Sequence, residues 1–332
     1  MTTDHSPHGK TVWISWEIHR RTRELSKTFG ADLFVYNCDS SHGPFLRYIL
    51  SSFYTIRYLF SSRPDILIVQ NPSLFLASLA CLLKIYFKYK LVVDRHTNFW
   101  LEAENSFRPK ALVFTLFSKY SLRHADLTIV TNTYLKDIVE KKGGRGFVLT
   151  DKLPALERKN KKHLVGRWNI VFISTFSDDE PYLEVFKAAK LIQSDVFIYV
   201  TGNFKKIMDR IPEEMPPNLV LTGFLEEQDF IDLLFSADAI MDFTTAEWTL
   251  VCGGYEAISA GKPFITSDKV VLREYFNKGT IFAENNYLSI SDAVNSIISR
   301  NNQYESEIKA LKDEKTIEWT LQFSKLLELM NT

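Results

Sequence analysis

The chain has 332 residues, of which 45% are hydrophobic and 24% charged, a globular composition with enough length for two domains. Lys plus Arg and Asp plus Glu each number 40, so the zero net charge argues against a nucleic-acid binder driven by bulk charge. The segment Met1 to Lys10 is polar and no apolar run reaches about 20 residues, which predicts neither a secretory signal nor a membrane span.

In the first half, short apolar runs alternate with segments of helical periodicity. The predicted strands are 11–16, 32–36, 66–69, 91–94, 126–130 and 147–149, and the predicted helices are 18–29, 45–60, 74–88, 111–123 and 133–142. This alternation is typical of a parallel sheet covered by helices on both faces.

The helix predicted over 45–60 is amphipathic. Its apolar residues recur on one face: Phe45, Ile49, Phe53, Ile56 and Phe60. We favour burial of this face, because most amphipathic helices pack their apolar side on a core. Arg47 and Arg57 beside these residues leave docking on a membrane surface as the alternative.

A hydrophilic, basic segment over 158–167 is predicted to be a solvated linker, with contact to anionic lipid as the alternative. After it the alternation resumes, with strands at 168–173, 196–200, 219–221 and 239–243 and helices at 181–193, 228–237, 290–300 and 304–330. The sequence therefore predicts an α/β protein with two doubly wound halves, 1–157 and 168–310, that face a cleft, followed by a helix over 311–332. Ligands of such sheets bind beyond the carboxyl ends of the strands.

The stretch from Thr244 to Asp268 has the composition of a ligand-binding corner. A polar loop leads into Gly253 and Gly254, and Glu256 follows at the predicted start of a short helix. Glycines let a ligand approach the backbone, a helix N-terminus attracts an anion, and a Glu accepts hydrogen bonds from paired hydroxyls. The expected ligand carries a phosphate and a sugar diol. A turn at the glycines and a dipole-stabilised acid are the alternatives.

Three segments resemble GT-B-type glycosyltransferases of the glycosyl transferases group 1 family. Asn218–Phe224 is similar to a strand and turn of that family, Leu234–Ala239 to a helix end, and Tyr255–Asp268 to its L-E-A-M-A-x-G-x-P-V-I-x-S-D motif. Tyr199–Asn203 and Leu91–His96 show a weaker resemblance. The resemblance implies two Rossmann-like domains, with a nucleotide-sugar held by the C-terminal domain, an acceptor on the N-terminal domain, and a last helix that packs back on the N-terminal domain.

The resemblance also assigns residues to the donor. Glu256 matches the family's ribose-binding Glu, and the glycines and Tyr255 belong to the same segment. Glu247 is the candidate for the Glu that contacts the donor sugar and acts in catalysis. Eight residues separate it from Glu256 where the family has seven, and Trp248-Thr249-Leu250 replaces the usual Gly-Phe-Gly. This segment is where donor preference, or loss of activity, is expected to be decided.

Other strand ends supply further donor candidates. Thr175 follows a strand and is expected to touch the ligand through its backbone, and Gly202 ends another strand. Lys205 and Lys206 would stabilise the departing diphosphate, or form an exposed cationic pair. The acids at 178–180 precede Pro181 and are interpreted as a helix cap, so no metal is assigned.

The N-terminal half carries the remaining candidates. His96 ends a strand and could orient the donor sugar or assist proton transfer, and Asp94 could position it or act as a base. A loop histidine bound by hydrogen bonds is the alternative. His19, Arg20 and Arg21 open a helix and could bind an acceptor phosphate, or form a solvated helix face.

Together these features predict a hexosyltransferase-like enzyme that needs no metal or other cofactor. It would transfer a sugar from a nucleotide-sugar to a hydroxyl of a glycan or lipid-linked acceptor, in surface polysaccharide biosynthesis.

The three cysteines, Cys38, Cys81 and Cys252, lack metal-ligand spacing and predict reduced thiols in the cytoplasm. Contact with the inner face of the membrane is a further expectation, and no nucleic-acid partner is expected. The alternatives are a nucleotide-sugar epimerase of related fold and an inactive nucleotide-sugar-binding scaffold.

Overall fold

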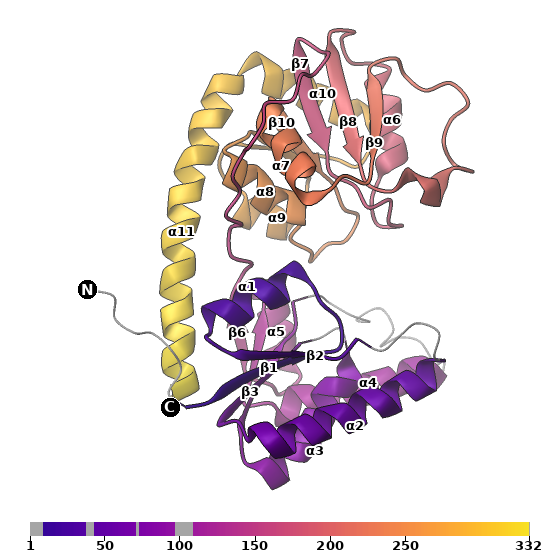
Figure 1. Cartoon of the computed structure of the whole chain (residues 1–332). Helices are drawn as coiled ribbons and strands as arrows, with labels where there is room; N and C mark the ends of the chain where they lie inside the picture. Colours follow the sequence, from indigo (N-terminus) through magenta and orange to yellow (C-terminus); the bar gives the residue numbers. More distant parts are fainter. Residues whose placement is uncertain (1–8, 38–42, 71–72, 97–108, 332) are drawn as a thin grey trace. The chain divides into compact units, whose positions relative to one another are not determined.

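The chain forms two compact units, each built around its own sheet (Figure 1). A computed structural model describes residues 9–37, 43–70, 73–96 and 109–331. Unit 1 comprises Met1–Lys152 and Glu318–Thr332, and unit 2 comprises Leu153–Ile317. Each sheet has six strands, and neighbouring strands are parallel.

Unit 1 has the predicted alternation of strands and helices. Its strands are β1 (Thr11–Ser15), β2 (Asp32–Val35), β3 (Ile66–Gln70), β4 (Lys90–Asp94), β5 (Leu127–Val130) and β6 (Gly146–Val148). Its helices are α1 (Arg20–Thr28), α2 (Pro44–Ser62), α3 (Leu74–Phe87), α4 (Pro109–His124) and α5 (Thr133–Lys141). The strand order is β2-β1-β3-β4-β5-β6, so the direction of winding reverses at β1.

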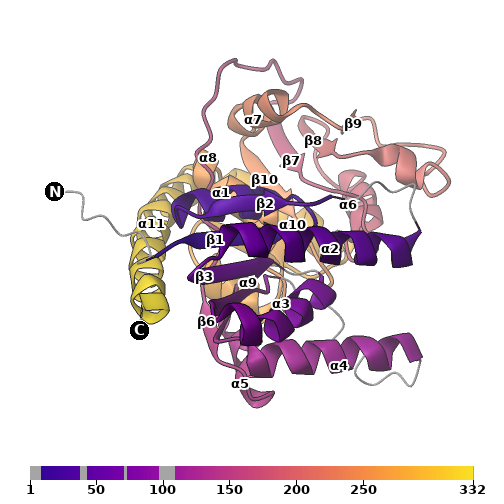
Figure 2. The ribbon, with the colours of Figure 1, turned by 60° about the horizontal axis from the view of Figure 1, so that its bottom comes forward.

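Both faces of this sheet are buried. Successive side chains of a strand point to opposite faces, so Trp13 and Ile68 enter one core while Val12 and Leu67 enter the other. Helices α2, α3 and α4 lie side by side over the second of these faces (Figures 1 and 2). The favoured burial of the apolar face of α2 is wrong, because Phe45, Ile49, Phe53 and Phe60 are exposed.

The last helix, α11 (Asn301–Asn331), begins in unit 2 and ends in unit 1. Its C-terminal part joins the core formed by Trp13 and Ile68. The indole Nε1 of Trp319 donates a 3.0 Å hydrogen bond to the carbonyl of Thr150, and its ring stacks on Phe323 at 5.0 Å. The predicted return of the C-terminal helix to the N-terminal domain is confirmed.

Unit 2 repeats the architecture. Its strands are β7 (Trp168–Phe172), β8 (Val196–Thr201), β9 (Leu219–Gly223), β10 (Ala239–Asp242), β11 (Phe264–Ser267) and β12 (Thr280–Ala283). Its helices are α6 (Tyr182–Ala189), α7 (Glu227–Ser236), α8 (Cys252–Ala260), α9 (Val270–Tyr275) and α10 (Tyr287–Ser299), with a 3₁₀ turn at Phe204–Ile207. The strand order β12-β11-β10-β7-β8-β9 places the switch in winding between β10 and β7. The sequence analysis missed α9 and β12, which are both short.

The segment 158–167, expected to be a solvated linker, is bound to unit 2. The backbone N–H of Lys159 donates to the Asp232 carboxylate at 2.8 Å, and that of Lys162 donates to the Ser236 hydroxyl at 2.9 Å. Its backbone is therefore held along α7, while its Lys and Arg side chains account for the hydrophilic composition. The first crossing between the units lies earlier, between Lys152 and Leu153.

Candidate functional site

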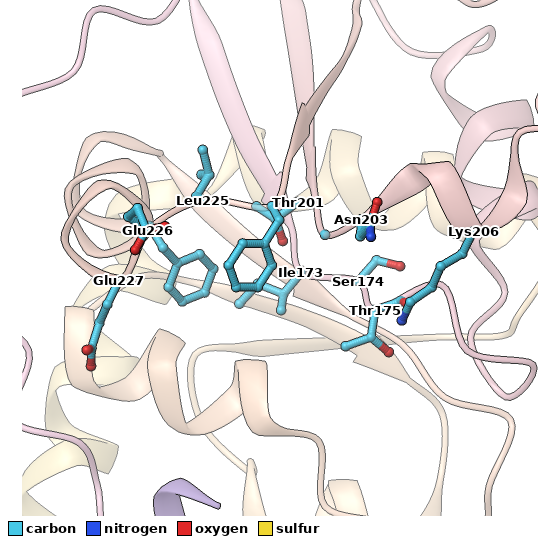
Figure 3. Close-up of a pocket in the computed structure, with 12 residues that line it drawn as sticks. Ile173, Ser174, Thr175, Thr201, Asn203, Lys206, Leu225, Glu226 and Glu227 are labelled. Carbon is cyan, nitrogen blue, oxygen red and sulfur yellow. The ribbon is translucent and has the colours of Figure 1, made fainter. Parts of the chain in front are cut away.

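A pocket of about 470 Å³ lies in unit 2, where β7, β8 and β9 end (Figure 3). This volume is in the range of small-molecule sites. The pocket is lined by Ile173, Ser174, Thr175, Thr201, Gly202, Asn203, Lys206, Phe224, Leu225, Glu226, Glu227 and Phe230. Thr175, Gly202 and Lys206 were predicted, whereas the residues from 224 to 230 were not. The two Phe rings and Leu225 supply apolar surface on which a flat ring can stack.

Gly202 lets the ends of β7 and β8 approach closely. Its φ of +100° lies in a region that side chains rarely allow, and a Cβ there would overlap the carbonyl oxygen of Ser174. The Gly202 N–H donates to the carbonyl of Gly223 at 3.1 Å, which joins the ends of β8 and β9. The glycine expected from the sequence is therefore needed to form the pocket wall.

The loop after β7 is organised around the Glu180 carboxylate. Backbone N–H groups of Thr175 and Phe176 donate to it at 2.9 Å, and the hydroxyls of Ser174 and Thr175 donate at 2.5 and 2.6 Å. Phe176 adopts a left-handed conformation with φ 57°, which turns its N–H toward the same point. The loop thus forms a small anion-binding nest filled by the chain's own carboxylate. Glu180 was predicted only as part of a helix cap.

Lys206 lies at the rim of this loop. Its Nζ donates to the Thr175 carbonyl at 3.1 Å, and both side chains line the pocket (Figure 3). Asn203 Oδ1 accepts from the Lys205 N–H at 3.2 Å and starts the 3₁₀ turn that carries both lysines. Both lysines are exposed, but Lys205 is not among the lining residues. The two lysines therefore have different settings.

The Gly253-Gly254 pair lies inside α8 and not in a turn before it. The Gly253 N–H donates to Asp242 Oδ2 at 2.7 Å, and a Cβ on Gly253 would stand 2.7 Å from the Cβ of Asp242. A Cβ on Gly254 would overlap the ring of Phe276. Both glycines thus allow α8 to pack closely on its neighbours. Tyr255 lies in the core against Phe276, with ring centroids 5.8 Å apart.

Glu256 is the fifth residue of α8, so the expected position at the helix start is wrong. Its side chain is buried near the Asp242 carboxyl at the end of β10. Burial raises the pKa of Asp242 well above its ordinary value, and the charges of Glu180 and Glu256 add to this, although the Gly253 N–H opposes it. The sequence analysis did not single out Asp242, because one Asp at the end of a strand has no distinctive motif.

Glu247 has a different environment from Glu256. It lies in the loop between β10 and α8, its side chain is 62% exposed, and it forms an ion pair with Lys269. Glu247 does not line the pocket. In the part of the chain that the structure describes, no group of three or more His, Cys, Asp and Glu could hold a metal ion. The expectation that no metal is needed stays a prediction.

In unit 1, Asp94 at the end of β4 and Arg21 on the first turn of α1 form a buried ion pair. Arg21 Nη2 lies 2.8 Å from Asp94 Oδ1, and Nη1 contacts Asp151. Burial alone would raise the pKa of Asp94, but the charge of Arg21 and the contact with His96 lower it well below the ordinary value. These contacts bear on two calls that stay predictions. A guanidinium enclosed by two carboxylates has few donors left for an acceptor phosphate, and the lowered pKa of Asp94 beside Arg21 makes that carboxylate a weak base.

His96 lies next to this pair. Its Nδ1 is 3.4 Å from Asp94 Oδ2, and its ring centroid is 6.2 Å from that of His19. His19 Nε2 is 3.4 Å from Glu17 Oε2, whereas Arg20 is exposed on the first turn of α1. The ends of β1 and β4 thus bring two histidines and two carboxylates together. That Asp94 positions His96 stays a prediction.

Comparisons with known proteins bear on the fold. No family model matches the sequence, and no curated protein matches it. Among solved structures, HepE from Anabaena in complex with UDP-glucose matches with a TM-score of 0.73 and 13% identity, over 97% of this chain and 100% of that one. Sucrose-phosphate synthase from Thermosynechococcus elongatus matches with a TM-score of 0.72 and 10% identity, over 96% and 98%. A protein described as a UDP-N-acetylglucosamine 2-epimerase from Listeria monocytogenes matches with a TM-score of 0.62 and 13% identity, over 90% and 91%.

These matches extend over nearly the whole chain, and their low identity limits what they show to the fold. In this chain the matched fold consists of two parallel six-stranded sheets and a last helix that returns to unit 1. The chain has the GT-B fold of the glycosyltransferases.

Proposed function

We propose that the chain is a glycosyltransferase that moves a sugar from a nucleotide-sugar to a hydroxyl of a glycan or lipid-linked acceptor. The pocket where β7, β8 and β9 end is the observation that carries the proposal. It combines apolar surface for a base with a lysine and a loop rich in N–H donors for a diphosphate. That HepE, of the same fold, was solved with UDP-glucose supports a donor of this class.

The donor would bind in unit 2 through three kinds of contact. The base would stack on the apolar side of the pocket, formed by Phe224, Leu225 and Phe230. The diphosphate would lie toward Lys206 and the Thr175 loop, where the Glu180 carboxylate now takes up the donors of the nest. Ribose hydroxyls would donate to Glu256, the role that the family resemblance implies. The role of Glu247 on the donor sugar also remains part of the proposal.

In the reaction, the bond between the anomeric carbon and the diphosphate oxygen breaks, and a bond from that carbon to the acceptor oxygen forms. The acceptor hydroxyl loses its proton, and the nucleoside diphosphate leaves with the extra negative charge. Lys206 would stabilise that charge. His96 is proposed to accept a proton or orient the sugar, because an imidazole nitrogen can take up a proton and its Nδ1 lies 3.4 Å from Asp94 Oδ2.

Specific observations favour two other functions. The fold match to the Listeria protein supports a nucleotide-sugar epimerase, which would need no acceptor. The ion pair between Glu247 and Lys269 supports an inactive nucleotide-sugar-binding scaffold, because it engages the carboxylate expected at the donor sugar. A place in surface polysaccharide biosynthesis, in the cytoplasm at the inner face of the membrane, is part of the glycosyltransferase proposal.

A thermal-shift screen over UDP-, GDP-, ADP-, dTDP- and CMP-sugars tests the donor site. We expect one nucleotide class to raise the melting temperature of the wild-type protein and to raise that of the Lys206→Ala variant much less. Lys190→Ala, at the end of α6, is the matched control and should respond like the wild type. If no nucleotide-sugar stabilises the wild type, the proposed donor site is wrong.

Product analysis separates the three functions once a donor is known. The donor is incubated alone and with a pool of glycan and lipid-linked acceptors. Release of nucleoside diphosphate that depends on acceptor supports the transferase, and an altered sugar without acceptor supports the epimerase. Donor binding without turnover in either mixture supports the scaffold.

A further inference from the structure

Helix α2 of unit 1 turns its apolar face away from the sheet. Apart from Leu59, the side chains that it buries are small and polar: Ser51, Thr55 and Ser62. Its large apolar side chains are exposed, with Phe45 at 80% and Phe53 at 58% of full exposure. The Thr55 hydroxyl accepts a 3.0 Å hydrogen bond from Nε1 of Trp16, a buried residue that follows β1. This buried contact fixes the orientation of α2, so the helix exposes the face that a surface helix normally buries.

The exposed apolar surface continues over α3, which lies beside α2, and over α4, which lies beside α3 (Figure 2). Of the 26 large hydrophobic side chains that are exposed in the described chain, seven lie on α2 and three each on α3 and α4. Ile85 of α3 is 80% exposed and Leu116 of α4 is 68% exposed. At the surface, Phe60 of α2 meets Tyr86 of α3, with ring centroids 5.7 Å apart. Half of the exposed hydrophobic side chains thus gather on three adjacent helices, which we call the α2–α4 face.

The α2–α4 face is also biased in charge. The sequences of the three helices contain six Lys and Arg residues and no Asp or Glu. The whole chain, by contrast, has 40 residues of each sign. Arg57 of α2, Lys88 at the end of α3 and Lys119 of α4 are exposed. Exposed aromatic and aliphatic side chains among cations are the composition of a surface that enters a lipid interface.

We propose that the α2–α4 face docks on a membrane surface that contains anionic lipids. Its aromatic and aliphatic side chains would enter the interface between headgroups and acyl chains, and its Arg and Lys side chains would contact the anionic headgroups. A second copy of the chain is a poorer occupant, because two such faces would bring cations together with no carboxylates from the three helices. The proposal rests on the membrane location given under the proposed function and names the surface responsible, but its test is separate from catalysis, since docking needs neither donor nor acceptor.

Co-sedimentation of the full chain with vesicles tests the proposal. One set of vesicles contains phosphatidylcholine alone, and the other contains equal parts of phosphatidylcholine and phosphatidylglycerol. We expect binding to the anionic vesicles, about tenfold stronger than to the neutral ones and weakened by high salt. Equal binding to both sets, or binding to neither, would overturn the proposal.

Two pairs of variants locate the surface. Phe53→Glu with Ile85→Glu should abolish binding, whereas Leu191→Glu with Leu288→Glu makes the same charge change at exposed apolar positions of unit 2 and should bind like the wild type. Arg57→Gln with Lys119→Gln should weaken binding and reduce its salt dependence, because it removes cations and leaves the apolar surface intact. Melting temperatures of all variants establish that each has folded.

If the Phe53/Ile85 and Leu191/Leu288 double variants lose vesicle binding to the same extent, the α2–α4 face is not the specific membrane-binding surface, and its assignment is overturned. Analytical ultracentrifugation supplies one more outcome. If the wild type dimerises without binding vesicles, and Phe53→Glu with Ile85→Glu restores the monomer, the face is a protein interface and the membrane proposal is wrong.

Discussion

Arg21 and Asp94 form a buried ion pair that joins the first turn of α1 to the end of β4, 73 residues further along the chain. The Asp94 side chain is fully buried, and Arg21 also binds Asp151 and the carbonyl of Leu149. The pair therefore ties the strand end that carries His96 to the segment that precedes the first crossing between the units. Removing the charge of one partner leaves the other charge buried and only partly balanced by opposite charge.

Asp94→Asn should lower the free energy of unfolding by about 3–5 kcal/mol at neutral pH, because it leaves the buried Arg21 charge only partly compensated. Chemical denaturation followed by tryptophan fluorescence measures this loss. Asp137→Asn, an exposed acid on α5, is the control and should stay within about 0.5 kcal/mol of the wild type. A loss no larger than that of the control would contradict the view that the pair stabilises unit 1.

The same pair predicts a pH dependence. The pKa of Asp94 is lowered in the folded chain, so its contribution to stability is present above the ordinary Asp pKa of about 4 and is lost as the pH falls toward the lowered value. The unfolding free energy of the wild type should fall more steeply below about pH 4 than that of Asp94→Asn. Parallel curves for the two proteins would show that another carboxyl dominates acid unfolding.

Glu180→Gln should loosen the loop that borders the pocket. The Glu180 carboxylate accepts hydrogen bonds from two backbone N–H groups and two hydroxyls, and the amide of Gln replaces one acceptor oxygen with a donor. We expect a loss of stability of about 1–3 kcal/mol and a weaker thermal shift with the nucleotide identified in the screen. Asp178→Asn is the matched control, since the Asp178 side chain is 99% exposed. A variant that keeps both properties would rule out an organising role for Glu180.

Gly202→Ala should damage the pocket. The new Cβ would overlap the carbonyl of Ser174, and φ +100° is unfavourable for alanine, so we expect a loss of at least about 2 kcal/mol and no nucleotide-induced shift. Gly43→Ala provides the comparison, because Gly43 has φ −57° and open space around its Cβ position. Melting curves with and without nucleotide measure both effects, and a Gly202→Ala protein that melts like Gly43→Ala would disprove the close approach.

Trp319→Ala should destabilise unit 1 although residue 319 lies near the chain end. The substitution removes the hydrogen bond to Thr150 and the stacking on Phe323, and the loss of such a buried aromatic costs about 3–5 kcal/mol. Ile317→Ala, two residues earlier and 62% exposed, should cost little. Limited proteolysis should release fragments of unit 1 first in the Trp319 variant. Equal resistance in the two variants would contradict the packing of α11 on unit 1.

Much of the fold follows from local patterns. Apolar runs separated by helical repeats identified most strands of both sheets, and parallel strands bring their carboxyl ends to one edge, where Thr175, Gly202 and Lys206 meet. A short helix was also expected in the segment that carries Glu256. It was expected to start at Glu256, but it starts at Cys252. Gly253 and Gly254 resemble a turn in sequence, yet close packing on Asp242 and Phe276 makes them part of α8.

Taken alone, the sequence determined the α/β class, the order of the main elements and the strand ends at which ligands are expected, because these depend on neighbours along the chain. Tertiary structure decided which face of α2 is buried, that Arg21 binds Asp94, and that Glu180 fills the loop after β7. Periodicity shows that a helix has an apolar face but not which face meets the sheet. A lone Arg or Glu likewise has a partner only when folding brings distant residues within hydrogen-bond distance.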